Sequence, residues 1–149
     1  MHLQKETTIS RIENEHQKAM VNVFYTFNWL HDKMKQLVLP YDVTNQQFSI
    51  LRILRWQYPA PSTINLLKYE MLDKMCDASR IVDRLVQKDL VIKEPNQFDK
   101  RSVNIMISKK GLALLKKMDN EISISGIVSI NLTDGEAAQL NKLLDKMRG

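Results

Sequence analysis

The sequence contains few of the residues that interrupt regular structure or cross-link a chain. Its 149 residues include four glycines, four prolines and a single cysteine, Cys76. Glycine and proline interrupt helices and strands, so their scarcity favours a mainly helical protein over a loop-rich or all-β one. A lone cysteine cannot form an internal disulfide, which fits the reducing environment of the cytoplasm.

Long hydrophobic runs are also missing. The longest stretch without a charged residue, 19–31, is too short to cross a bilayer, which takes about 20 apolar residues. The N-terminal segment MHLQKETTISR has no apolar core after its first charge, so we expect no secretory signal. We therefore expect a soluble, cytoplasmic protein with no membrane partner.

Catalytic and metal-binding signatures do not occur in the sequence. There is no glycine-rich phosphate loop, no G-x-S-x-G and no H-E-x-x-H. The three histidines, His2, His16 and His31, have no second histidine or cysteine at the spacing of metal ligands. The sequence therefore predicts a protein that is not an enzyme and has no metal site and no cofactor.

Charge points to a polyanionic partner. The formal net charge is +5, although a basic surface that binds nothing would give the same value.

The length fits one domain, 1–149, with helical extensions.

A long amphipathic helix is expected near the N-terminus. Apolar residues recur at steps of three and four from Ile9 to Val38, and Pro40 follows them. A helix of this length in so small a protein needs an apolar partner surface. That surface could belong to its own core or to a second chain.

Capping signals place the other helices. Thr44 with Gln47, and Thr133 with Glu136, have the spacing of capping boxes, and Ser108 is a further expected N-cap. A short helix capped by Ser62 or Thr63 is expected to bury four apolar residues. These are Ile64, Leu67, Met71 and Leu72. The last helix is expected to turn its leucines and Met147 inward.

A helix over residues 76–88 precedes a predicted hairpin. Apolar side chains fall on one face of that helix, and polar or charged ones cover the rest. A strand-like run at Leu90–Ile92, turn residues at 95–100 and strict alternation over 103–107 then follow. This order is typical of a winged helix-turn-helix.

The polar face of that helix carries residue types that can read DNA. Arginine can bond guanine O6 and N7 with two hydrogen bonds, and a serine hydroxyl can contact base or phosphate, so Ser79, Arg80 and Arg84 are candidates. Asp77 suits both helix capping and a base contact. Ion pairing of the two arginines with Asp77 and Asp83 is the alternative.

The tip of the predicted hairpin is also basic. Asp99, Lys100 and Arg101 could place cations along phosphates or in the minor groove. The Asp99 carboxylate could orient the Arg101 guanidinium. A charged hairpin is also a common device against edge-to-edge aggregation.

Several ordered motifs give a resemblance over nearly the whole chain. They are Thr44-x-x-Gln-Phe48-x-x-Leu51, Ser79-Arg-Ile-Val-Asp-Arg-Leu85, Lys88-Asp-Leu-Val91, Asp99-Lys-Arg101, Ile107-Ser-Lys-Lys-Gly-Leu112 and Leu132-Thr-Asp-Gly-Glu136. With these motifs the chain resembles the MarR family of bacterial transcriptional regulators.

The resemblance implies a mostly α fold with a small β-hairpin wing. It implies a winged helix-turn-helix lobe over 44–108 and dimerisation helices over 8–39 and 109–149. Such a protein would act as a homodimer on a palindromic operator in double-stranded DNA, most simply as a repressor. A winged helix that binds only proteins is the alternative.

The resemblance also implies a ligand site, and the chain has two features that set it apart from the family pattern. Family members often bind small aromatic ligands, and Phe24, Phe27, Trp29 and Tyr41 could line such a pocket or simply belong to a core. Asp89 stands where the family usually has glycine, so we expect a left-handed backbone there. Cys76 lies at a helix N-terminus that could acidify its thiol, although a buried or incidental cysteine is favoured.

Overall fold

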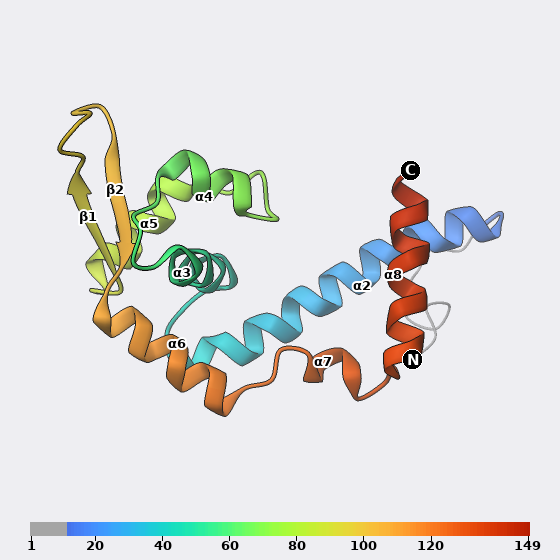
Figure 1. Ribbon diagram of the computed structural model, residues 1–149. Helices are drawn as coiled ribbons and strands as arrows, with labels where there is room; N and C mark the ends of the chain where they lie inside the picture. The colour runs from blue at the N-terminus through green and yellow to red at the C-terminus, as the bar shows by residue number, and fades with distance from the viewer. Residues whose placement is uncertain (1–11) are drawn as a thin grey trace. The chain divides into compact units, whose positions relative to one another are not determined.

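The computed structural model describes residues 12–149, which form helices and one antiparallel two-stranded sheet. The elements in chain order are α2 (Glu15–Val38), the 3-10 turn η1 (Leu39–Tyr41), α3 (Asn45–Gln57), α4 (Ile64–Glu70), α5 (Ala78–Gln87), β1 (Val91–Pro95), β2 (Val103–Ile107), α6 (Lys109–Glu121), α7 (Gly126–Ser129) and α8 (Asp134–Arg148) (Figure 1). The predicted fold class, mostly α with a hairpin, is confirmed. Within 12–149, no helix is long and apolar enough to cross a membrane.

The described chain divides into two compact units. The first comprises the residues up to Met34 together with Ser123–Gly149, and the second comprises Lys35–Ile122. The second unit contains all of 44–108, the segment expected to form the DNA-binding lobe.

Helix α3 lies at the centre of the second unit. The Thr44 hydroxyl accepts from the Gln47 backbone N–H at 3.1 Å, and the Gln47 side chain accepts from the Thr44 N–H at 3.1 Å, as the predicted capping box requires. Phe48, Leu51 and Leu54 are buried, and α3 contacts α4, α5, α6 and β2. This core therefore fixes α5 against the rest of the unit.

The β1–β2 hairpin is anchored at its base. Val91 pairs with Ile107, and Pro95 pairs with Val103 at the far end. Ser62 extends the sheet, because its N–H donates to the Ile105 carbonyl at 2.8 Å and its carbonyl accepts from the Ile105 N–H at 2.9 Å. The alternation expected for β2 is present, with Ile105 and Ile107 buried. The far end is left free to project.

Two expected boundaries differ from the observed ones. Leu72 was predicted to point inward, but it is fully exposed, because α4 ends at Glu70 and the chain is extended at Met71. Helix α5 begins at Ala78 instead of Cys76, because Asp77 caps it.

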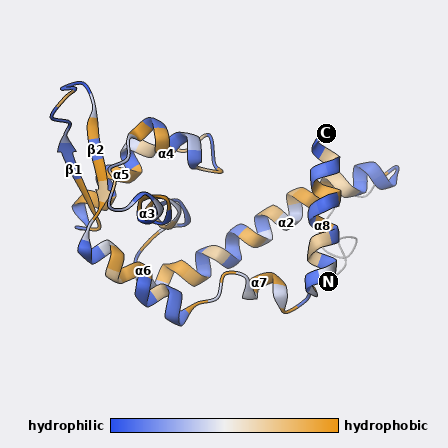
Figure 2. Cartoon of the chain, in the orientation of Figure 1, coloured by the Kyte–Doolittle hydropathy of each residue, from blue (hydrophilic) through white to orange (hydrophobic). Residues whose placement is uncertain are grey.

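The first unit leaves apolar side chains uncovered. Helix α2 begins at Glu15, and the expected helical position Ile9 lies outside the described residues. Three α8 residues expected to turn inward are instead exposed: Leu140, Leu143 and Met147. Figure 2 shows hydrophobic residues interleaved with hydrophilic ones along α2 and α8. These helices therefore retain apolar surface that a partner could cover.

Candidate nucleic-acid interface

Helix α5 presents the four predicted helix residues to solvent. It buries Ala78, Ile81, Val82 and Leu85 on one face. Asp77 is the N-cap, and its Oδ1 accepts from the Arg80 backbone N–H at 3.2 Å. Asp77, Ser79, Arg80 and Arg84 are all exposed. The strong amphipathicity of this segment thus fixes which side faces outward.

Neither arginine of α5 has an acidic partner among the described residues. Asp83, which could have neutralised one of them, instead accepts from Lys93 of β1 at 2.9 Å. The Asp77 carboxylate is held by backbone capping. Arg80 and Arg84 therefore keep their donors available, and the ion-pairing alternative does not describe this structure.

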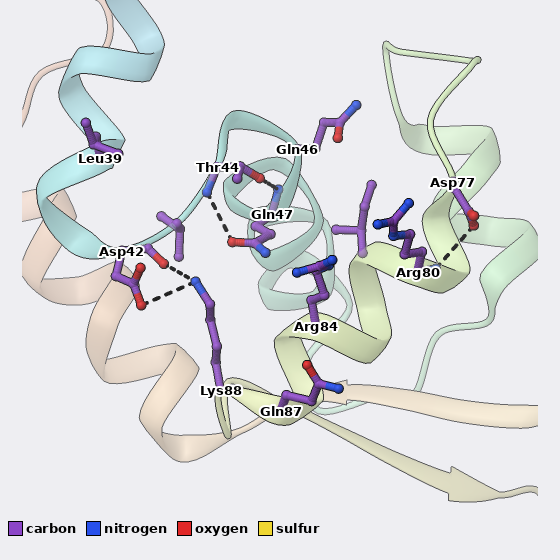
Figure 3. Close-up of a pocket in the computed structure, with 12 residues that line it drawn as sticks. Leu39, Asp42, Thr44, Gln46, Gln47, Asp77, Arg80, Arg84, Gln87 and Lys88 are labelled. Carbon is purple, nitrogen blue, oxygen red and sulfur yellow. Dashed lines mark hydrogen bonds and ion pairs between the residues drawn. The ribbon is translucent and has the colours of Figure 1, made fainter.

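A groove of about 600 Å³ separates α5 from the start of α3. Arg80 and Arg84 rise from α5 on the side that faces Gln46 and Gln47 of α3 (Figure 3). Gln46 is held in place by donating to Asp73 Oδ2 at 2.8 Å. The groove therefore combines two free guanidinium groups with the Gln46 amide, which can bond a base edge, whereas Gln47 is buried in its capping role.

Sequence reasoning missed two residues of this groove, Gln46 and Gln87. Gln87 was recoverable, since it lies three positions after Arg84 and seven after Arg80 on one helical face. Gln46 was not recoverable, because its place depends on how α3 packs against α5.

The wing tip holds the predicted cations in an ordered loop. The Asp99 carboxylate accepts from the Arg101 backbone N–H at 2.9 Å. The expectation that Asp99 orients the Arg101 guanidinium is therefore not met, and the carboxylate shapes the backbone instead. Lys100 and Arg101 are exposed. Among the described residues neither of them has an ion-pair partner, so both remain free for an anion.

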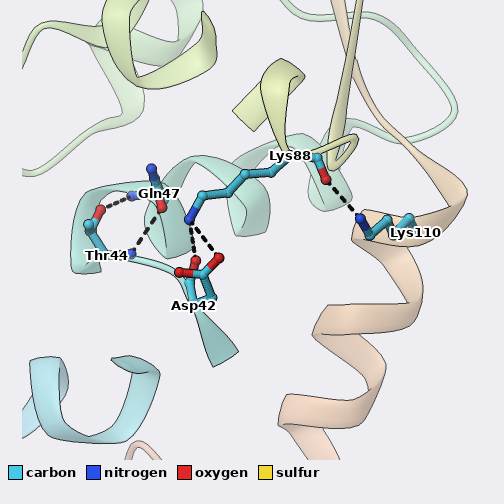
Figure 4. Close-up of polar contacts among 5 residues, drawn as sticks. All are labelled: Asp42, Thr44, Gln47, Lys88 and Lys110. Carbon is cyan, nitrogen blue, oxygen red and sulfur yellow. Dashed lines mark hydrogen bonds and ion pairs between the residues drawn. The ribbon is translucent and has the colours of Figure 1, made fainter. Parts of the chain in front are cut away.

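Polar contacts tie the C-terminal end of α5 to its neighbours. Lys88 Nζ lies 3.3 Å from Asp42 Oδ2, and Lys110 Nζ donates to the Lys88 carbonyl at 3.0 Å (Figure 4). The Ser108 hydroxyl donates to the Asp89 carbonyl at 2.6 Å. Asp89 has φ 60°, so the left-handed backbone predicted there is confirmed.

The four aromatic residues considered for a ligand site lie in different units. Phe24 and Phe27 are exposed on α2, and Trp29 is half-buried on the same helix. Tyr41 belongs to the second unit, where its hydroxyl donates to Glu121 Oε2 at 2.5 Å. This contact raises the pKa of Tyr41. Tyr41 also lines a shallow cavity of about 370 Å³ with Lys88, Leu90 and Lys117, to which the other three aromatics do not contribute.

Cys76 lies just before α5 and is half-buried. Burial and the neighbouring Asp73 carboxylate raise the pKa of its thiol, in contrast to the acidification that a helix N-terminus could give. The described part of the chain holds no cluster of histidine, cysteine or carboxylate side chains suited to a metal ion.

A helix with two free arginines, a groove against the preceding helix and a basic two-stranded tip together define a winged helix-turn-helix DNA-binding protein. Residues 43–103 match the sequence profile of the MarR family of transcriptional regulators. Proteins of this family are transcription regulators and not enzymes.

Named relatives agree with this assignment. The multiple antibiotic resistance protein MarR of Escherichia coli K12 is 29% identical over 116 residues, covering 76% of this chain and 79% of that protein. A cysteine-to-serine mutant of E. coli MarR complexed with operator DNA gives a TM-score of 0.72 at 28% identity, over 86% of this chain and 94% of the other.

Two further structures share the fold. A MarR-like regulator from Bacillus cereus has a TM-score of 0.80 at 20% identity, covering 90% of this chain and 96% of that one. The organohalide-sensing regulator RdhR in its 2,4-dichlorophenol-bound form has a TM-score of 0.78 at 22% identity, covering 99% and 87%. The chain is thus a DNA-binding transcriptional regulator with a MarR-type fold.

Proposed function

We propose that this regulator is a cytoplasmic homodimer that reads a palindromic operator in double-stranded DNA and represses transcription. The observation that carries the proposal is the exposure of Arg80 and Arg84 on α5 without acidic partners. The guanidinium groups of both can make paired hydrogen bonds to guanine in the major groove. Lys100 and Arg101 on the wing supply phosphate or minor-groove contacts.

Dimer formation is supported by the first unit. Phe24 and Phe27 of α2 and Leu143 of α8 expose more than half of their surfaces in the single chain. Apolar side chains of this size are stabilised when a second copy covers them. A symmetric dimer would place two α5 helices about one DNA turn, or roughly 34 Å, apart.

Release by a small aromatic ligand is part of the proposal. One relative of the same fold has been solved with 2,4-dichlorophenol bound. Phe24, Phe27 and Trp29, which all lie on α2, are the proposed contacts for such a molecule. Addition of 2,4-dichlorophenol should weaken DNA binding by the wild type and have less effect on Phe27→Ala.

The central test is a footprint and gel shift on the DNA upstream of the protein's own gene. Wild type should protect a palindrome that overlaps the promoter and should repress transcription from it in vitro. Arg84→Ala should weaken binding by roughly 5- to 150-fold and relax the preference for guanine in one half-site. Arg101→Ala should weaken binding to all sequences and reduce the salt dependence.

Arg148→Ala is the matched control, because it removes one cation from α8, where Arg148 pairs with Asp145. Its affinity for DNA should equal that of the wild type. Unchanged binding by both Arg84→Ala and Arg101→Ala would contradict operator reading and favour a winged helix that binds proteins.

A further inference from the structure

The wing tip carries an aromatic side chain, Phe98, that has no packing role within the second unit. Phe98 lies between the two strands of the wing and is 97% exposed. It is followed directly by Asp99, Lys100 and Arg101. An apolar ring held out in water beside two cations calls for a partner with both apolar and anionic surface.

The loop that holds Phe98 is built by other residues. Asn96 Oδ1 accepts from the Phe98 N–H at 2.8 Å and from the Asp99 N–H at 3.0 Å. Asn96 Nδ2 donates to Asn104 Oδ1 at 3.0 Å across the base of the loop. The Ser102 N–H donates to the Asp99 carbonyl at 3.0 Å. These bonds fix the backbone of the tip without the phenyl ring, so the ring has no structural role there.

The chemistry of the tip matches a DNA minor groove. Phosphates form the walls of that groove and attract cations such as Lys100 and Arg101. The deoxyribose rings that line it offer apolar surface beside the polar base edges. Proteins that enter the minor groove often place a phenylalanine against or between base steps, where it partly unstacks them.

We propose that Phe98 is a DNA-contacting residue of the wing that packs into the minor groove and favours operators with a flexible pyrimidine–purine step beneath it. Such steps unstack most easily, so the ring can select sequence without a hydrogen bond to a base. The inference rests on the proposed DNA binding through α5 and the wing.

The test uses the full-length protein and a short duplex cut from the region that the wild type protects upstream of its gene. Phe98→Ala should weaken binding about tenfold with an unchanged salt dependence, since no phosphate contact is lost. Phe98→Leu should retain most of the affinity. Replacing the pyrimidine–purine step under the wing with an A-tract should weaken wild type but leave Phe98→Ala nearly unaffected.

The controls separate this inference from the function on which it rests. Phe98→Ala should keep the wild-type melting temperature and oligomeric state, because the ring supports neither the loop nor, on this proposal, a protein contact. Phe98→Ala binding within twofold of the wild type would overturn the role of Phe98 while Arg84→Ala still tests operator reading. Loss of the dimer in Phe98→Ala would also overturn it. Wild type that protects no DNA would refute the proposed function itself.

Discussion

Lys88 and Asp42 form an ion pair that joins the end of α5 to the segment before α3. Lys88 Nζ lies 3.3 Å from Asp42 Oδ2 and also donates to the Asp42 carbonyl. Asp42 has φ 57°, in the left-handed region, where it ends the turn η1. Both the charge and the backbone conformation of Asp42 should therefore contribute to the stability of the junction between α5 and the segment before α3.

Substitutions at Asp42 should separate these two contributions. Asp42→Asn keeps a residue that tolerates the left-handed region and removes the charge, so the free energy of unfolding should fall by less than about 1 kcal/mol, as for exposed ion pairs. The loss should shrink in high salt. Asp42→Ala should cost about 1 kcal/mol more, because alanine is strained at positive φ. Urea denaturation measures both, and equal losses would show that the backbone conformation contributes nothing.

Asp89 should be replaceable by glycine with a gain in stability. Its N–H donates to the Val86 carbonyl at 2.9 Å, and the Leu90 N–H donates to the Leu85 carbonyl at 3.0 Å, which is the bonding pattern of a Schellman motif. At φ 60° glycine avoids the strain of a Cβ atom, so Asp89→Gly should raise the free energy of unfolding by about 1 kcal/mol. Asp89→Ala is the control and should not stabilise.

Local signals in the sequence were sufficient for the caps and for the outward face of α5. The capping boxes at Thr44 and Thr133 form as predicted, since each involves residues only three apart. The exposed positions Arg80 and Arg84 follow from helical periodicity in the same way. The left-handed backbone at Asp89 followed from the resemblance to a family that has glycine there.

Features that depend on packing between distant segments could not be predicted. The Asp83–Lys93 pair joins α5 to β1 and engages one of the carboxylates closest in sequence to Arg80 and Arg84. Gln46 enters the groove only because α3 packs against α5. Leu72 looked like part of a buried stripe, but the chain becomes extended at Met71, which stays buried while Leu72 points to solvent.

Gly111 should not tolerate a side chain. A Cβ atom at this position would lie 2.4 Å from the Leu90 carbonyl oxygen and 2.7 Å from Ile107 Cγ1. The carbonyl is backbone and already accepts from the Ser108 N–H, so it cannot move freely. Gly111→Ala should therefore lower the free energy of unfolding by about 1–3 kcal/mol, despite the better helix propensity of alanine.

Gly135→Ala provides the matched control for that substitution. Gly135 also lies in a helix, α8, but a Cβ atom there would meet nothing within 4 Å. Its melting temperature should equal or exceed that of the wild type, because only propensity changes. A similar loss in both variants would show that the close approach of α6 to Leu90 does not matter.

Glu136 should give the start of α8 a stability that disappears in acid. Its carboxylate accepts from the Thr133 N–H at 2.8 Å and from the Thr133 hydroxyl at 2.9 Å. These bonds lower the pKa of Glu136 below its ordinary value. A carboxyl whose pKa is lower in the folded state stabilises the fold above the unfolded pKa, about 4.3 for glutamate, and this contribution is lost as pH falls through the folded pKa.

Comparison with Glu136→Gln should isolate this contribution, because every other carboxylate titrates in both proteins. Glutamine can still accept from the Thr133 N–H, so the helix should keep its cap without the charge. The wild type should melt at a higher temperature than Glu136→Gln at pH 7, and the difference should close as the pH is lowered below about 4. Both proteins must be compared at one concentration, because assembly shifts the melting temperature. A difference that stays constant from pH 7 to pH 3 would contradict the assignment and would trace the effect of Glu136 to packing instead of ionisation.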